Sequence, residues 1–427
     1  MGGKNTGRDA QLVDRGVPAA PIERFAPRVM VLPFIDLSLA PDPMHIADGL
    51  TIDVTTELAR FPNLRVLSLN TALTYKGWPV PPQRLHDALG ARYLLEGSVE
   101  LSSDRLVVTV QLIRAAADEE LWAERFERLG AFSLDDYDDL ICQIVAGMDR
   151  HIAQVETEGA LHKRPSEVNA YEAYQRAIHS FSHNTKEELQ AALDLFRKVT
   201  ELEPGFARAW GYLAYTTIRG VTYGWIEPAA MDQAQDWVRR ALELDPTDYY
   251  NIWDLAFLHQ NCGRFVQAER AYQRAWRLNP NDAELLAEMA EFSICNGTPK
   301  LAIDQMRRAI EIAQDYPRWY DWTLGHAYFA SGDYGRAVAR LERDPALPCH
   351  ARLILAAALV HLGEPERARA IVGQVLQEEP RTSVEGLRQT DRRRRPQDRA
   401  HWLNALRAAG VPERPAGARP NVAAEEV

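Results

Sequence analysis

The chain has 427 residues, of which 46% are apolar, so it can bury two or more cores of ordinary domain size. Its net charge of -11 disfavours nucleic acid and anionic membranes as main partners, because both attract basic surfaces. The four cysteines are scattered and form no C-x-x-C pair, which indicates neither a zinc site nor a disulfide framework and favours a reducing, cytoplasmic location.

The first 27 residues lack the apolar stretch of a secretory signal and are expected to form a flexible leader. The longest apolar run, Leu353 to Val360, is far shorter than the roughly 18 residues that a membrane-spanning helix needs. No membrane span is therefore predicted.

Residues 28–160 change their hydrophobic period several times, which predicts a small α/β domain with a mixed sheet. Two helices are expected in its first half, at residues 48–60 and around Leu85 and Leu89, and a third over residues 134–155 leads out of the domain. Strands are predicted at residues 29–34, 64–68, 92–101, 105–115 and 120–126.

Four motifs of this domain resemble the TolB-type amino-terminal domain: Val31-Leu32-Pro33-Phe34, Ala47-Asp48-Gly49-Leu50, Leu95-Glu96-Gly97-Ser98-Val99 and Leu121-Trp122-Ala123-Glu124-Arg125-Phe126. Domains of that family commonly precede tetratricopeptide repeats (TPRs) in bacterial proteins related to class III adenylate cyclase and to winged-helix regulators. The resemblance implies a fold more securely than an activity, because folds are reused for unrelated functions.

From residue 165 the sequence repeats itself with a period near 34, which is typical of TPRs. The second helix of each repeat carries an alanine at a fixed place, namely Ala192, Ala234, Ala268, Ala302, Ala337 and Ala368. Small residues let the two helices of a repeat approach, and stacked repeats cover each other's apolar faces. We therefore predict an all-α TPR superhelix (α-solenoid) of about six repeats over residues 165–380.

Residues 381–411 are predicted to form a basic linker, with Arg392 to Arg395 at its centre, and a helix around Trp402 that caps the last repeat. Residues 412–427 are expected to be a disordered tail. The α/β domain and the array are expected to separate into two soluble fragments when the chain is cut between His162 and Pro165.

The search for catalytic motifs gives no G-x-G-x-x-G, no Walker-type loop, no H-E-x-x-H and no G-x-S-x-G, so no cofactor and no enzyme activity are predicted. A cyclase domain would need a carboxylate-bearing sheet of its own, and the 27 leading residues are too few for one. His179 and His183 stand at i, i+4, but no third metal ligand is evident near them. Asp135, Asp136, Asp138 and Asp139 are expected to charge a helix start.

The concave face of the array is the predicted partner-binding site. In the first helix of each repeat, the residues next to the packing motif around the helix should face the concave side. These residues are Tyr250, Trp253, Phe257 and Asn261 in the third repeat and Trp319, Trp322, His326 and Phe329 in the fifth. Each could instead pack against the next repeat, and this alternative stays open. Aromatic side chains are enriched at binding hot spots, which predicts an apolar or amphipathic protein or peptide partner, with self-association left open.

These observations favour a non-catalytic scaffold or regulatory protein. The alternative is the regulatory portion of an adenylate cyclase or transcription-regulator system whose effector domain is absent from this chain. An uncatalogued small-molecule or hydrolytic activity of the α/β domain is the third hypothesis.

Overall fold

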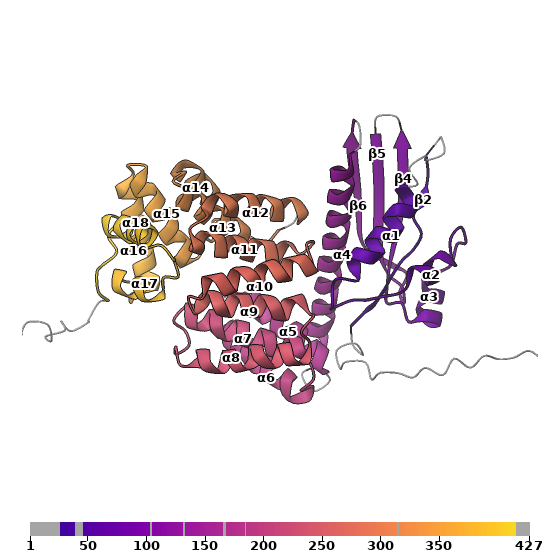
Figure 1. Cartoon of the computed structure of the whole chain (residues 1–427), viewed down its shortest axis with the longest axis horizontal. Coiled ribbons are helices and arrows are strands. Elements are labelled where there is room, and N and C mark those ends of the chain that lie inside the picture. The colour runs from indigo at the N-terminus through magenta and orange to yellow at the C-terminus, as the bar shows by residue number, and fades with distance from the viewer. Residues whose placement is uncertain are drawn as a thin grey trace, which may run out of the picture.

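The computed structural model describes residues 26–38, 46–102, 105–130, 133–164, 168–183, 185–313 and 316–415. A small mixed sheet with its helices is followed by a long run of helical pairs (Figure 1), which is the fold class that the sequence predicts. In these segments, no helix is long and apolar enough to cross a membrane. The predicted leader lies almost wholly outside the described residues.

The sheet has the strand order β3-β1-β4-β5-β6, with β2 also paired to β4. Strand β1 runs parallel to β3 and β4, whereas β5 is antiparallel to both of its neighbours. The sheet is therefore mixed: the pairs that β1 forms with β3 and β4 are parallel, whereas β4, β5 and β6 form an antiparallel meander. The strands are β1 (Arg28–Val31), β2 (Ile35–Asp36), β3 (Arg65–Val66), β4 (Tyr93–Ser102), β5 (Arg105–Arg114) and β6 (Glu119–Leu129).

Two helices cover one face of the sheet, α1 (Ile46–Leu58) and α4 (Leu134–His162), while α2 (Leu69–Leu73) and α3 (Pro82–Leu89) pack on the other. The alternation along β5 decides which residues are buried: Val108, Val110 and Leu112 are fully buried in the core beneath α1 and α4. The short helix α2 is an element that the sequence does not predict.

Helix α4 begins at a capping box, in which the Asp136 amide donates to Ser133 Oγ at 3.1 Å and the Ser133 amide donates to Asp136 Oδ2 at 3.0 Å. The predicted acidic helix start is thereby confirmed. The helix runs on to His162, seven residues past the predicted end at residue 155, and stands between the sheet and the helical array (Figure 1).

The array consists of six helix pairs. The repeated alanines are completely buried in all six, as close approach of the paired helices requires, and Gly263, Gly297, Gly332 and Gly363 follow four of the first helices in the left-handed conformation. The pairs are α5 (Ala170–Ser182) with α6 (Lys186–Leu202), α7 (Ala207–Thr222) with α8 (Ala230–Leu244), α9 (Tyr249–Asn261) with α10 (Phe265–Leu278), α11 (Ala283–Asn296) with α12 (Pro299–Ile312), α13 (Trp319–Ser331) with α14 (Tyr334–Leu341), and α15 (Cys349–His361) with α16 (Pro365–Glu378).

Two further helices follow, α17 (Val384–Thr390) and α18 (Pro396–Ala408), and α18 packs on α15 as a cap. The basic segment before α18 folds back on the array, where the Arg394 amide donates to the Cys295 carbonyl at 2.8 Å. The predicted tail needs a correction at its start, because the Val384 amide donates to the Pro412 carbonyl at 2.9 Å and so ties residue 412 to α17.

The α/β domain packs directly against the array, which argues against the expected independence of the two parts. Asn281 Nδ2 donates to Glu57 at 2.6 Å, and Arg308 pairs with Asp139 at 2.7 Å. Cys142 and Ala146 of α4 contact the apolar core of the array. Sequence periodicity reports packing within a repeat, so it carries no information on this contact between domains.

Candidate functional site

Three of the eight predicted groove residues lie in the core. Trp253 is 8% exposed and Phe257 is 5% exposed, because both pack against Tyr215 of the preceding repeat, with ring centroids 6.2 and 4.5 Å apart. Phe329 is 2% exposed. Other parts of the chain cover these side chains, namely the preceding repeat for Trp253 and Phe257, so the three residues cannot serve as exposed binding anchors.

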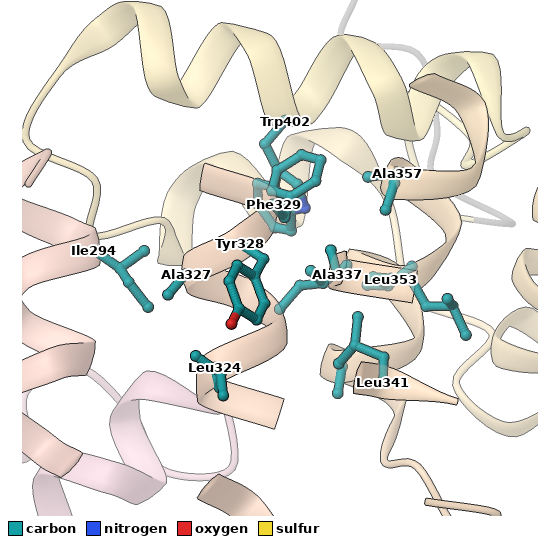
Figure 2. Close-up of a cluster of buried hydrophobic side chains, with 14 of the residues drawn as sticks. Ile294, Leu324, Ala327, Tyr328, Phe329, Ala337, Leu341, Leu353, Ala357 and Trp402 are labelled. Atoms are coloured by element: carbon teal, nitrogen blue, oxygen red, sulfur yellow. The ribbon is translucent and has the colours of Figure 1, made fainter. Parts of the chain in front are cut away.

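Phe329 is buried by the carboxyl-terminal cap. Its ring centroid is 5.5 Å from His401 of α18 and 5.8 Å from Tyr334. Figure 2 shows Phe329 within the same apolar cluster as Leu353 and Trp402. The repeat pattern cannot predict this burial, because α18 lies outside the repeats.

The other five predicted residues are half-buried: Tyr250, Asn261, Trp319, Trp322 and His326. Trp322 Nε1 donates to Asp344 at 2.9 Å, and Asn261 accepts from Thr222 at 2.9 Å. Arg393 of the basic segment lies 3.0 Å from His326 Nε2, and this arginine and burial hold the pKa of His326 well below its usual value. The Trp319 ring packs edge-on to Tyr320, with ring centroids 4.5 Å apart.

The centre of the concave face is bridged by the chain's own side chains. Tyr215 and Arg219 of α7 reach Glu288 of α11, at 3.2 and 3.8 Å. Burial raises the pKa of Glu288 to about 7, although Arg219 opposes that shift. Tyr223, at the end of α7, stacks on His350 of α15 with centroids 6.2 Å apart. These contacts join the second repeat to the fourth and the sixth.

A cavity of about 490 Å³ lies where α4 faces the first helices of the repeats, and we call it the α4 cavity. Its volume falls within the usual range of ligand sites. Helix α4 contributes Asp149, Arg150, Gln154, Thr157 and Glu158 to the lining. Residues from α5, α7, α9, α11 and α13 complete it, so the site exists only where the two domains meet.

Aromatic side chains of the lining include Phe61 and four tyrosines, namely Tyr174, Tyr212, Tyr250 and Tyr320. The Arg208 guanidinium stacks 3.5 Å from the Tyr250 ring centroid and pairs with Asp248 at 3.5 Å. Tyr320 is completely buried, and its hydroxyl has no hydrogen-bond partner in the described structure. An unpaired buried hydroxyl costs free energy, so it marks a place where a ligand group can be accommodated.

Three carboxylates gather at one side of the cavity. Asp149 accepts from Asn63 at 2.8 Å, and Asp282 accepts from the Tyr249 hydroxyl at 2.7 Å. Among the described residues, Glu284 forms no side-chain hydrogen bond or ion pair. The surrounding protein, with Asp282 and Asp149 beside it, raises the pKa of Glu284 to about 7, although the side chain itself is exposed to solvent. Burial and Asp282 raise the pKa of Asp149 to about 6. The acidic side of the cavity is therefore short of compensating charge.

Sequence reasoning selects only Tyr250 among these residues. The carboxylates come from α4 and α11, which are more than 130 residues apart in the chain, so no local motif joins them. His179 also lines the cavity; its ring centroid lies 4.7 Å from that of His183. Among the residues that the structure describes, no three His, Cys, Asp or Glu side chains are placed to hold a metal ion.

The comparisons with known proteins agree with the repeat architecture. The family model of the tetratricopeptide repeat matches residues 318–343 and 350–374, which fall on the last two helix pairs. The crystal structure of the APC/C hetero-tetramer Cut9-Hcn1 is similar, with 18% identity and a TM-score of 0.42 over 65% of this chain and 49% of that one.

Two named proteins are similar in sequence. The first is "Putative adenylate cyclase 3" of Rhizobium meliloti (strain 1021), 27% identical over 251 residues, which are 57% of this chain and 42% of that protein. The second is "Protein bimA" of Emericella nidulans, 30% identical over 116 residues, which are 27% of this chain and 13% of that protein. The chain thus spans less than half the length of either relative. The TolB-type resemblance of residues 28–160 stays a prediction.

Proposed function

We propose that this chain is a non-catalytic scaffold or regulatory protein whose TPR array binds a polypeptide segment on its concave face, beside helix α4. The observation that supports this most directly is the α4 cavity, which both domains line. A segment bound there contacts the α/β domain and the array at once, so binding can be transmitted between them.

The geometry favours an amphipathic partner. The centre of the concave face is occupied by the Arg219 and Glu288 bridge, which leaves the end beside α4 for a ligand. Trp319 is half-buried, and its ring contacts Tyr320, which lines the cavity; we infer that its exposed part is the apolar surface that a bound segment covers. Aromatic anchors of this kind carry much of the energy of protein interfaces.

The test is affinity capture from an extract of the source cells. We expect Trp319→Ala to weaken partner capture about tenfold or more, as truncation of an interface anchor does. Trp78→Ala is the matched control, because Trp78 is 75% exposed on the α/β domain, away from the array. Equal loss with both variants, or with neither, would contradict the proposal.

A second candidate is the regulatory portion of an adenylate cyclase system, and the 251-residue match to the Rhizobium meliloti protein favours it. Capture of a nucleotide cyclase would support this candidate. Under the leading proposal, the purified chain forms no cyclic AMP from ATP and Mg²⁺, and turnover in that assay would overturn it.

A further inference from the structure

The α4 cavity has the features of a site for an organic cation. We propose that it binds the guanidinium or ammonium group of an arginine or lysine side chain, within the polypeptide segment of the proposed function, on which this inference rests. The proposal concerns a subsite: the cation enters the α4 cavity, while apolar residues of the same segment cover Trp319.

The charge of the lining supports this assignment. Asp149, Glu158, Asp282 and Glu284 line the cavity, against Arg150 and Arg208. Arg208 is already held by Asp248, which lies behind the wall at 3.5 Å. Glu284 is an exposed side chain of the lining, and a cation placed beside it would gain a charge-assisted hydrogen bond.

An independent observation comes from the tyrosines. Among the described residues, the hydroxyl of the fully buried Tyr320 has no partner. Burial, together with the charges of the nearby Glu284 and Asp282, raises its pKa well above the usual value. Tyr250 already stacks with a guanidinium at 3.5 Å, so this wall is suited to cations. A hydroxyl and aromatic faces beside a carboxylate suit an alkylated nitrogen better than a metal ion, for which the described residues offer no ligand cluster.

The arrangement is unfavourable without a ligand. Like charges that lie close together in a partly buried site destabilise the folded state. Proteins retain such destabilising arrangements where a function requires them. Loss of solvent raises the pKa values of Asp149 and Glu284, and the neighbouring carboxylates add to that shift. A bound cation would lower both pKa values and relieve the repulsion.

The experiment uses the full chain and capped peptides. Acetyl-Gly-Arg-Gly-amide and its lysine analogue are titrated in saturation-transfer NMR. The citrulline peptide, which has the same shape as the arginine peptide but no charge, is the control for charge. Capped arginine alone tests whether a single amino acid derivative is enough for binding. We expect both cationic peptides to bind, citrulline to fail, and capped arginine to bind more weakly than the arginine peptide.

Variants make the result specific. Glu284→Gln keeps the side-chain shape but removes the charge, and we expect about tenfold weaker binding, the usual cost of one charge-assisted hydrogen bond. Glu187→Gln is the matched control, because Glu187, like Glu284, is an exposed glutamate in the first turn of a repeat helix but does not line the cavity. Tyr320→Phe should weaken binding without loss of fold, since the hydroxyl has no partner to lose.

Equal binding of citrulline, unchanged binding by Glu284→Gln, or binding of capped arginine as tight as that of the peptide would overturn this inference. If no cation binds but Trp319→Ala still abolishes partner capture, the subsite fails and the proposed function stands. If the cationic peptides bind and no polypeptide is captured, the subsite stands as a cation site and the proposed function fails.

Discussion

Glu284 lines the α4 cavity, and its raised pKa makes the stability of the folded state depend on pH. An unfolded glutamate titrates near its usual value, whereas the folded state holds the proton up to a pKa of about 7. The folded state therefore binds more protons between those values, and stability falls as pH rises through this window. Asp149, with a pKa of about 6, acts in the same direction.

We predict that Glu284→Gln raises the melting temperature at pH 8, by only about 2 °C because Glu284 is exposed and solvent screens its charge. At pH 5 the gain should vanish, since the wild-type carboxyl is then protonated. Thermal melts at the two pH values, with Glu187→Gln alongside, measure this. A destabilised variant at pH 8 would mean that Glu284 has a structural partner.

Trp253 and Trp319 should behave oppositely. Trp253 is 8% exposed against Tyr215 and Tyr250, so Trp253→Ala should cost about 3 kcal/mol of folding free energy. Trp319→Ala removes a half-buried ring and should leave the chain folded while it weakens partner capture. Denaturant unfolding of both variants is the measurement, and a stable Trp253→Ala would show that its burial is wrongly assigned.

The contrast between these tryptophans shows what the sequence could not predict at this scale. The periodicity identifies side chains that point away from the contact between the two helices of a repeat. All eight predicted groove residues do lie on the first helices of their repeats. Whether such a side chain is then covered depends on the neighbouring repeat, as for Trp253, or on a later helix, as for Phe329. Both contacts are long-range and leave no mark on local spacing.

At the scale of elements, the sequence predicts well wherever a pattern repeats. The repeated alanines and glycines fix six helix pairs because each pair meets the same packing requirement. The failures are elements without a period, such as α2, and the extension of α4 to His162. The last turns of α4 contact α5, where Arg176 donates to the Ala160 carbonyl at 3.0 Å, and only the tertiary structure contains this contact.

Helix α18 should be essential to the last repeat. Leu406 is completely buried and packs in the same apolar cluster as Leu355 and Phe329. Leu406→Ala should therefore cost about 3 kcal/mol. Hydrogen exchange should show the loss first in α15, which α18 covers; uniform loss of protection over all repeats would contradict a local capping role.

At the scale of the whole molecule, α4 belongs to both domains. It covers the sheet and also packs on α5 and α12, with Cys142 and Ala146 against the core of the array. The hydrophobic patterns in the sequence report packing within the α/β domain or within the repeats. They could not predict the interface between the two.

A protease site inserted after Lys163 tests the interface. We predict that the two halves stay together after cleavage and co-elute in size-exclusion chromatography, because separation would expose the apolar side of α4. Raising the salt concentration should weaken the Arg308 and Asp139 pair only modestly. Separate elution of two soluble halves would restore the independence that the repeats alone suggest.

The central claim is that a polypeptide binds on the concave face beside α4, and site-specific photo-crosslinking in the source cells tests it most directly. A photoreactive residue at Gln154, an exposed residue of the α4 cavity lining, should crosslink to a second polypeptide. The same residue at Gln273, exposed on α10 and absent from the cavity lining, should not. Crosslinks from Gln273 but not from Gln154 would contradict the account.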